Sequence, residues 1–166
     1  MKAGSGLDPA ASIGPLVDSR AVEKVDRQVE DALAKGAELV LGGRRLTQEG
    51  LDKGFFYAPT ILSRITPEML IYREETFGPV APVVPYDNEA DLLAMANDTH
   101  YGLAAYVYTR SLSTAMRYFE GLQFGIIGIN DINPTAAAAP FGGMKESGQG
   151  REGAVEGIFE YLETKL

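Results

Sequence analysis

The chain has 166 residues, 45% of them hydrophobic, and a formal net charge of −8. This length and apolar content suffice for one globular domain with a core, and they argue against a disordered chain. Lys and Arg are scattered, so no binding of nucleic acid or of an anionic membrane is expected. Because the chain has no cysteine, disulfides, thiolate metal sites and thiol nucleophiles are excluded, and no metal site is expected.

The stretch through Val17 is rich in Gly, Pro and Ala without a period, which predicts an extended surface segment. No apolar run approaches the length that spans a bilayer, and the start of the chain has neither an apolar signal segment nor an Arg-rich amphipathic stretch. We therefore expect a soluble, cytoplasmic protein.

The first half of the chain predicts a helix, two strands and a short helix. A helix over residues 20–35 is indicated by apolar residues at helical spacing, namely Val22, Val25, Val29, Ala32 and Leu33. Residues 38–41 predict a short strand, and residues 54–62 a second β-type run. The order Thr-Pro-Glu at residues 66–68 predicts the start of a short helix, because proline is tolerated at a first helical position.

In the second half helices and strands alternate. Asn88 is the expected cap of a helix, and residues 104–109 and 125–130 are expected strands, the first of them buried. Two further helices are indicated by apolar spacing, at Leu112, Ala115, Phe119 and Leu122 and at Val155, Ile158, Phe159 and Leu162. The alternation predicts an α/β fold with a mainly parallel sheet and flanking helices. With no boundary signal, residues 1–166 are expected to form a single domain.

Two segments carry residues suited to chemistry. In residues 73–80 adjacent carboxylates run into an aromatic residue and a Gly-Pro break. From the pattern alone, a solvated charge pair before a turn is favoured, and the alternative is a carboxylate held to accept two hydrogen bonds from a vicinal diol such as a ribose.

The second segment, residues 140–153, has five glycines in fourteen residues and leads into a helix. It fits a flexible loop, or a fixed loop in which Phe141 and the Arg151-Glu152 pair have a function. It is not a dinucleotide-binding fingerprint, because the glycine order, a preceding strand and a downstream ribose-binding acid are missing.

These segments resemble signatures of the aldehyde dehydrogenase superfamily, in its order and at its spacing. The resemblance rests on Glu-Glu-Thr-Phe-Gly-Pro-Val at 74–80, Ala-Asn-Asp-Thr at 96–99, Gly-Ile-Asn at 128–130 and Pro-Phe-Gly-Gly at 140–143 with Ser-Gly-Gln-Gly-Arg-Glu at 147–152. It implies the C-terminal part of the family's catalytic domain plus the C-terminal segment, about the last third of a subunit. Residues 74–82 and 140–148 most resemble the succinate-semialdehyde branch.

The resemblance implies roles for five residues. Glu75 would bind the nicotinamide ribose hydroxyls and Phe77 would pack near the nicotinamide. Phe141 would line the aldehyde tunnel, Thr135 would offer a hydroxyl to the substrate carboxylate, and Glu152 would relay protons to the general base. Structural alternatives remain, because Phe77 fits a core aromatic, Phe141 a loop anchor and Glu152 a first-turn acid favoured by the helix dipole.

The resemblance also implies a reaction that this chain does not carry alone. The family oxidises an aldehyde to a carboxylic acid with NAD or NADP, through a cysteine thiolate and a glutamate base. The chain has no cysteine, and the base, the cofactor fingerprint and the arginines for a substrate carboxylate belong to the family's upstream part.

The leading hypothesis is therefore a fragment, inactive by itself, of an enzyme whose expected substrate is succinic semialdehyde. Its expected partners are the rest of the subunit or further copies of the chain, together with a small aldehyde. The alternative is a non-catalytic oligomerisation or interaction module that retains the family fold. The choice between NAD and NADP stays open.

Overall fold

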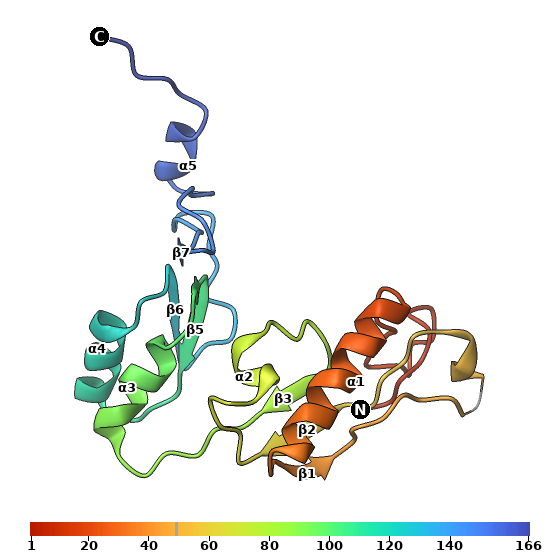
Figure 1. The fold of residues 1–166 in the computed structure, drawn as a ribbon. Helices are drawn as coiled ribbons and strands as arrows, with labels where there is room; N and C mark the ends of the chain where they lie inside the picture. Colours follow the sequence, from red (N-terminus) through yellow and green to blue (C-terminus); the bar gives the residue numbers. More distant parts are fainter. Residues whose placement is uncertain (49) are drawn as a thin grey trace. The chain divides into compact units, whose positions relative to one another are not determined.

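The computed structural model describes residues 1–48 and 50–166. It divides into two compact units, Met1–Pro85 and Tyr86–Leu166, and each is described by itself (Figure 1). The expectation of a single domain over residues 1–166 concerns both units together and stays a prediction.

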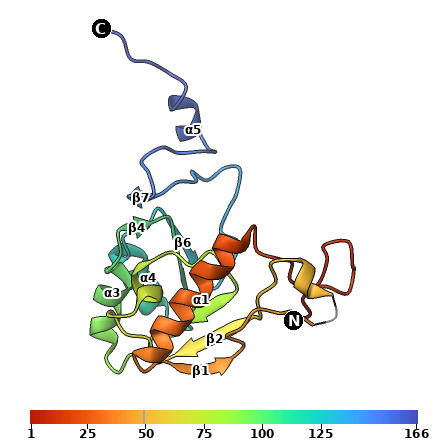
Figure 2. The same ribbon diagram turned by 45° about the vertical axis from the view of Figure 1, so that its right-hand side comes forward.

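The first unit is a helix packed on a three-stranded sheet. Its elements are α1 (Ser19–Ala34), β1 (Glu38–Leu41), the 3-10 helix η1 (Leu51–Lys53), β2 (Thr60–Ser63), α2 (Leu70–Arg73) and β3 (Val80–Pro82). Strand β2 is central, antiparallel to β1 and parallel to β3. Helix α1 lies across one face of this sheet (Figures 1 and 2). The predicted first helix and first strand are confirmed.

The core of this unit forms between α1 and the sheet. Its buried members are Val22, Val25, Val29, Ala32, Tyr57, Leu62, Ile65, Met69 and Ile71. The predicted apolar stripe of α1 is thus confirmed, except that Leu33 is exposed. Each buried side chain of this size contributes about 1.5–3 kcal/mol, so this stripe accounts for the place of α1.

Helix α2 begins later than the sequence predicts. The expected start at residues 66–68 is a turn, and the helix begins at Leu70, whose preceding residue offers no side-chain cap. The Leu70 amide instead donates to Asp31 Oδ2 on α1 at 2.8 Å. The acceptor that fixes the start of α2 therefore lies 39 residues upstream. The sequence around Leu70 cannot reveal an acceptor at that distance.

The second unit contains two helices beside a parallel strand pair. Its elements are α3 (Glu89–Asn97), β4 (Tyr101–Gly102), β5 (Ala104–Val107), α4 (Leu112–Gly121), β6 (Ile126–Ile129), β7 (Met144–Lys145) and α5 (Glu156–Phe159). Strands β5 and β6 are parallel and joined through α4, whereas β4 and β7 are antiparallel. Asn88 caps α3 as predicted, its side-chain oxygen accepting from the Ala90 amide at 3.0 Å.

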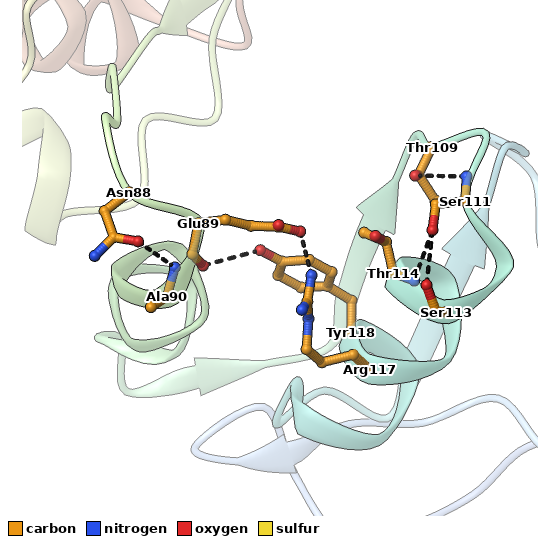
Figure 3. Close-up of polar contacts among 9 residues, drawn as sticks. All are labelled: Asn88, Glu89, Ala90, Thr109, Ser111, Ser113, Thr114, Arg117 and Tyr118. Atoms are coloured by element: carbon orange, nitrogen blue, oxygen red, sulfur yellow. Dashed lines mark hydrogen bonds and ion pairs between the residues drawn. The ribbon is translucent and has the colours of Figure 1, made fainter.

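Polar contacts join the start of α3 to the middle of α4 (Figure 3). Arg117 forms an ion pair with Glu89, and the Tyr118 hydroxyl donates to the Glu89 carbonyl at 3.4 Å. Tyr118 is 6% exposed, whereas Phe119, which the sequence placed in the apolar stripe, is 53% exposed. The buried face follows Ala115, Tyr118 and Leu122, and one position further along turns the side chain about 100° away from it.

The predicted α/β class is confirmed, but the strands of the described residues form three small sheets instead of one mainly parallel sheet. Two pairings are parallel and two are antiparallel. Each parallel pair is joined through a helix, as such a connection requires. Strand β5, predicted as buried, is partly exposed, and Tyr106 stands largely in solvent.

The last predicted helix is a single turn. Helix α5 covers only Glu156–Phe159, and the four apolar residues of its predicted stripe are each more than half exposed. A turn of this length needs packing to persist, and within the second unit the chain beyond it extends without a covering element (Figures 1 and 2).

One polar side chain of α1 is fully buried. Gln28 is 0% exposed, and its Nε2 donates to Glu74 Oε2 at 3.4 Å. Its Oε1 has no hydrogen-bond partner among the described residues. A buried acceptor without a partner lowers stability.

We therefore predict that Gln28→Met raises the free energy of unfolding of the chain by about 1 kcal/mol, because methionine fills a similar volume without an unpaired oxygen. Urea denaturation followed by circular dichroism measures the change. A lower unfolding midpoint for the variant would show that the amide stabilises the core.

Asp31 predicts a pH dependence. The Leu70 amide and then Lys35 hold the pKa of this carboxyl below its ordinary value. Its contribution to stability is therefore complete above the unfolded-state pKa of about 4 and is lost as the pH falls through the lowered folded-state pKa. Asp31→Asn should lower the free energy of unfolding at neutral pH, and this free energy should then fall less steeply below pH 4 than in the wild type. Urea titrations at several pH values measure both effects. Glu23→Gln, at an exposed position of α1, is the control, and equal acid sensitivity of Asp31→Asn and wild type would contradict the assignment.

Candidate functional site

The segment of residues 74–80 links α2 to β3 and begins with a carboxylate that is held in place. Arg27 Nη2 donates to Glu74 Oε2 at 2.7 Å, and Arg27 Nη1 reaches Oε1 at 3.4 Å. Gln28 contacts the same carboxylate. The adjacent Glu75 is exposed and forms no hydrogen bond or ion pair with the residues that the structure describes. Of the two carboxylates, Glu75 is the one free to bind a ligand.

The end of this segment is fixed by close packing. A Cβ at Gly78 would lie only 2.7 Å from Cγ2 of Val25 on α1. The next carbonyl, of Pro79, accepts from the Thr60 amide of β2 at 2.8 Å. A larger residue at position 78 would therefore push the segment away from the helix.

Phe77 lies between these two anchors. It has a φ of +45° and is 82% exposed. A bulky residue with positive φ is strained, and such strain occurs often at functional sites. The ring borders a groove of about 490 Å³, lined also by residues 13–16, Tyr57, Gly78 and Pro79. The core-aromatic alternative for Phe77 does not fit its exposure in the first unit.

In the second unit, Phe141 and Glu152 are direct neighbours. Each backbone amide donates to the other's carbonyl at 2.7 Å, so the two residues form an antiparallel bridge that closes the loop between them. Phe141 is 38% exposed, and Glu152 is exposed as well.

Glycines pack this loop tightly. A Cβ at Gly142 would lie 2.3 Å from the Gly150 carbonyl oxygen. A Cβ at Gly125 would lie 1.9 Å from the Gly142 oxygen. Arg151 Nη1 donates to the carbonyls of Gln149 and Gly150 at 3.0 and 2.9 Å. These contacts favour a fixed loop over a flexible one.

The loop surrounds a cavity of about 900 Å³. Phe141 supplies apolar wall, and Ser147, Arg151, Glu152 and Glu160 supply polar groups. Glu160 Oε1 accepts from the Arg151 amide at 3.0 Å, which ties the turn after α5 to the loop. An apolar wall beside a few polar groups suits a small organic ligand.

Thr135 lies apart from this cavity. It is exposed, its hydroxyl donates to Asn133 Oδ1 at 2.8 Å, and it is not among the residues that line the cavity. The structure thus brings together Phe141 and Glu152, and separately Glu75 and Phe77. The expectation that Glu75 and Phe141 face one cleft joins residues of different units and stays a prediction.

Sequence reasoning missed Arg27 and Gln28, which hold Glu74. One signal was available, because Gln28 lies within the apolar stripe of α1 between Val25 and Ala32. A polar residue on a buried helix face needs a partner, and a search for that partner would have led to a distant residue.

Two absences concern only residues 1–48 and 50–166. These residues contain no group of three or more His, Cys, Asp or Glu side chains placed to hold a metal ion. Among their helices, none has both the length and the apolar character needed to cross a membrane.

The chain is similar to enzymes named for semialdehydes. It is 47% identical over 165 residues to the mitochondrial succinate-semialdehyde dehydrogenase of Oryza sativa subsp. japonica, with 99% of this chain and 31% of that protein covered. It is 47% identical to a non-phosphorylating aspartate-semialdehyde dehydrogenase of Halomonas elongata, over 98% of this chain and 32% of that protein. With the NADP(+) succinate-semialdehyde dehydrogenase of Escherichia coli the identity is 49%, covering 98% and 33%.

Solved structures agree in fold. An aldehyde dehydrogenase from Brucella melitensis biovar abortus superposes with a TM-score of 0.92 at 47% identity, covering 99% of this chain and 33% of that one. A betaine aldehyde dehydrogenase from Staphylococcus aureus, in complex with NAD+, gives a TM-score of 0.92 at 38% identity with the same coverage. The chain thus spans about a third of the length of the proteins it matches.

The aldehyde dehydrogenase family model matches residues 1–166, the whole chain. Together with identities near 47% to named members and the superposition on solved ones, this match shows that the chain belongs to the aldehyde dehydrogenase family.

Proposed function

We propose that this chain is part of an aldehyde dehydrogenase subunit that oxidises an aldehyde to a carboxylic acid with NAD or NADP. The observation that carries the proposal is the contrast between two adjacent carboxylates. Glu74 is held by α1, whereas Glu75 is exposed and has no hydrogen-bond or ion-pair partner among the described residues, beside the strained, exposed Phe77. Succinic semialdehyde is the proposed substrate, because relatives named for it match nearly the whole chain.

The first unit fits the nicotinamide end of such a cofactor. The Glu75 carboxylate can accept two hydrogen bonds from vicinal ribose hydroxyls, since no group of residues 1–48 and 50–166 bonds to its oxygens. Phe77 offers an exposed ring for packing beside the nicotinamide. When bound, the cofactor supplies the hydride acceptor. Glu75 and Phe77 bind and orient it.

The second unit fits the aldehyde side. Phe141 offers an apolar wall that holds the substrate chain and excludes water. Glu152, paired to it through the backbone, is placed in the same cavity and relays protons. Thr135 remains the proposed hydroxyl for a substrate carboxylate, although it lies outside this cavity and would act only with residues that complete the pocket.

The nucleophile and the general base are assigned to the part of the subunit that this chain lacks. The chain has no cysteine that could form the acyl-enzyme, and its relatives are about three times as long. The remainder of the subunit is therefore the proposed partner, supplied within a longer chain or by a second one.

The alternative is a non-catalytic module that assembles through its C-terminal segment. It is favoured by the exposure of the apolar residues that follow the 140–153 loop, namely Val155, Ile158, Phe159, Tyr161 and Leu162. An exposed stripe of this kind is typical of a protein interface. Association of the chain only with itself, and never with an upstream partner, would favour this module.

We predict that the isolated chain oxidises no aldehyde, because losing a nucleophile and a base each lowers the rate by orders of magnitude. The assay follows NADH and NADPH formation from succinic semialdehyde by pure chain. The matched control supplies the upstream two thirds of a subunit as a separate polypeptide, which should restore turnover. Turnover by the chain alone, with contaminating full-length enzyme excluded, would contradict the proposal.

In a full-length subunit, we predict that Glu75→Gln and Phe141→Ala act on different substrates. Loss of one hydrogen bond to a charged acceptor at Glu75 should raise the activation free energy of hydride transfer by about 1.5–3 kcal/mol. Phe141→Ala should raise the KM for the aldehyde and leave cofactor affinity unchanged. Steady-state kinetics with each substrate varied separate the two, and identical effects of both variants would argue against separate roles.

A further inference from the structure

We propose that Glu74 is a positioning residue: held by Arg27 and Gln28 of α1, it fixes Glu75 and Phe77 where they meet the nicotinamide half of the cofactor. This inference rests on the proposed function, because it needs Glu75 as the ribose-binding residue. Arg27, Gln28 and Glu74 act through their neighbours and not by touching the cofactor.

Helix α1 holds α2 at both ends. At the start of α2, Asp31 accepts from the Leu70 amide at 2.8 Å. At its end, the Glu74 amide donates to the Leu70 carbonyl at 2.8 Å, while the Glu74 carboxylate is bound by Arg27 and Gln28. Residues 27, 28 and 31 lie within one turn of α1 and share a side of the helix. The place of Glu74 is thus set by the rigid helix and not by the loop.

In the part of the chain that the structure describes, the segment beyond Glu74 is next held at Gly78, which packs against Val25 of the same helix. Three residues separate these two anchors, and among them Glu75 and Phe77 are exposed. Because consecutive Cα atoms lie about 3.8 Å apart, such a short span leaves Glu75 little freedom while both anchors hold. Release of Glu74 frees one end of the span and allows Glu75 to shift.

The contacts of Glu74 contribute little to stability. The side chains of Arg27 and Glu74 are 54% and 38% exposed, and exposed ion pairs are weak. Gln28 carries a buried acceptor without a partner in the described part of the chain, which weakens the core. Arg27 and Gln28 therefore both bind the Glu74 carboxylate although neither contact contributes much to stability. This points to the positioning of residues 75–78 as their role.

The experiment uses the full-length subunit with Arg27→Met, Glu74→Gln and Gln28→Met. Kinetics with succinic semialdehyde carrying deuterium on its aldehyde carbon give kcat, both KM values and the isotope effect. Hydrogen exchange of residues 75–78, measured without cofactor, reports on the segment independently of activity.

We expect Arg27→Met and Glu74→Gln to lower kcat about tenfold, since small misplacements of reacting groups are costly. The isotope effect should rise, the KM for the aldehyde should stay constant, and amides of residues 75–78 should exchange faster. Gln28→Met should raise the melting temperature and yet lower kcat, by a smaller factor than the other two. If Gln28 acted only on stability, a variant with a higher melting temperature would not have a lower kcat.

Two controls accompany these variants. Arg20→Met removes an ion pair of the same helix, between Arg20 and Asp18, and should change neither kcat nor exchange in residues 75–78. The charge-reversed double variant, Arg27→Glu with Glu74→Arg, restores an ion pair and should recover part of the lost kcat.

If Glu75→Gln slows hydride transfer while Arg27→Met and Glu74→Gln match the wild type, the positioning role is wrong and the proposed function stands. If Glu75→Gln itself matches the wild type, the role of Glu75 fails and this inference fails with it. A lower melting temperature with equal changes in both KM values would mark a general structural defect and would also overturn it.

Discussion

The packing of α1 on its sheet is the interaction on which the rest of the first unit depends. Its buried stripe fixes the helix against β2, and Arg27, Gln28 and Asp31 then reach α2 and Glu74. The same stripe contains Val25, on which Gly78 rests. Apolar burial supplies the free energy, whereas the polar contacts determine where the candidate ligand-binding residues lie. Helix α1 therefore forms part of the core and also holds the segment that carries the candidate ligand-binding residues.

The second unit depends on close backbone approach instead of a large core. Gly142 packs against the Gly150 carbonyl, and Gly125 packs against the Gly142 carbonyl, at distances that leave no room for a Cβ. The Phe141–Glu152 bridge closes the loop around these contacts. Because glycine has no side chain, the backbone can approach this closely and hold Phe141 and Glu152 in place, which explains why a glycine-rich segment forms a fixed loop.

The sequence predicted the elements whose causes are local and missed those whose causes are distant. The period of α1 and the cap at Asn88 are properties of neighbouring residues, and both predictions are confirmed. The start of α2 depends on Asp31, which no local pattern links to Leu70. The prediction of a longer last helix was wrong, because apolar spacing alone does not stabilise a helix whose apolar side chains are not buried within its unit. The α/β class followed from alternation, whereas the division into small sheets depends on pairings that alternation does not specify.

The same distinction applies to the candidate site. The motif at residues 74–80 pointed to adjacent carboxylates, but their different surroundings depend on α1, where Gln28 lies 46 residues before Glu74. Only the structure shows that Glu74 is held while Glu75 is free. The strained, exposed Phe77 lowers stability, and so does the buried Gln28 oxygen, which has no partner among the described residues. Phe77 belongs to the segment of residues 74–80, and Gln28 binds the first residue of that segment. Proteins tolerate strain and unpaired polar groups at functional sites, and these two lie close together in the first unit.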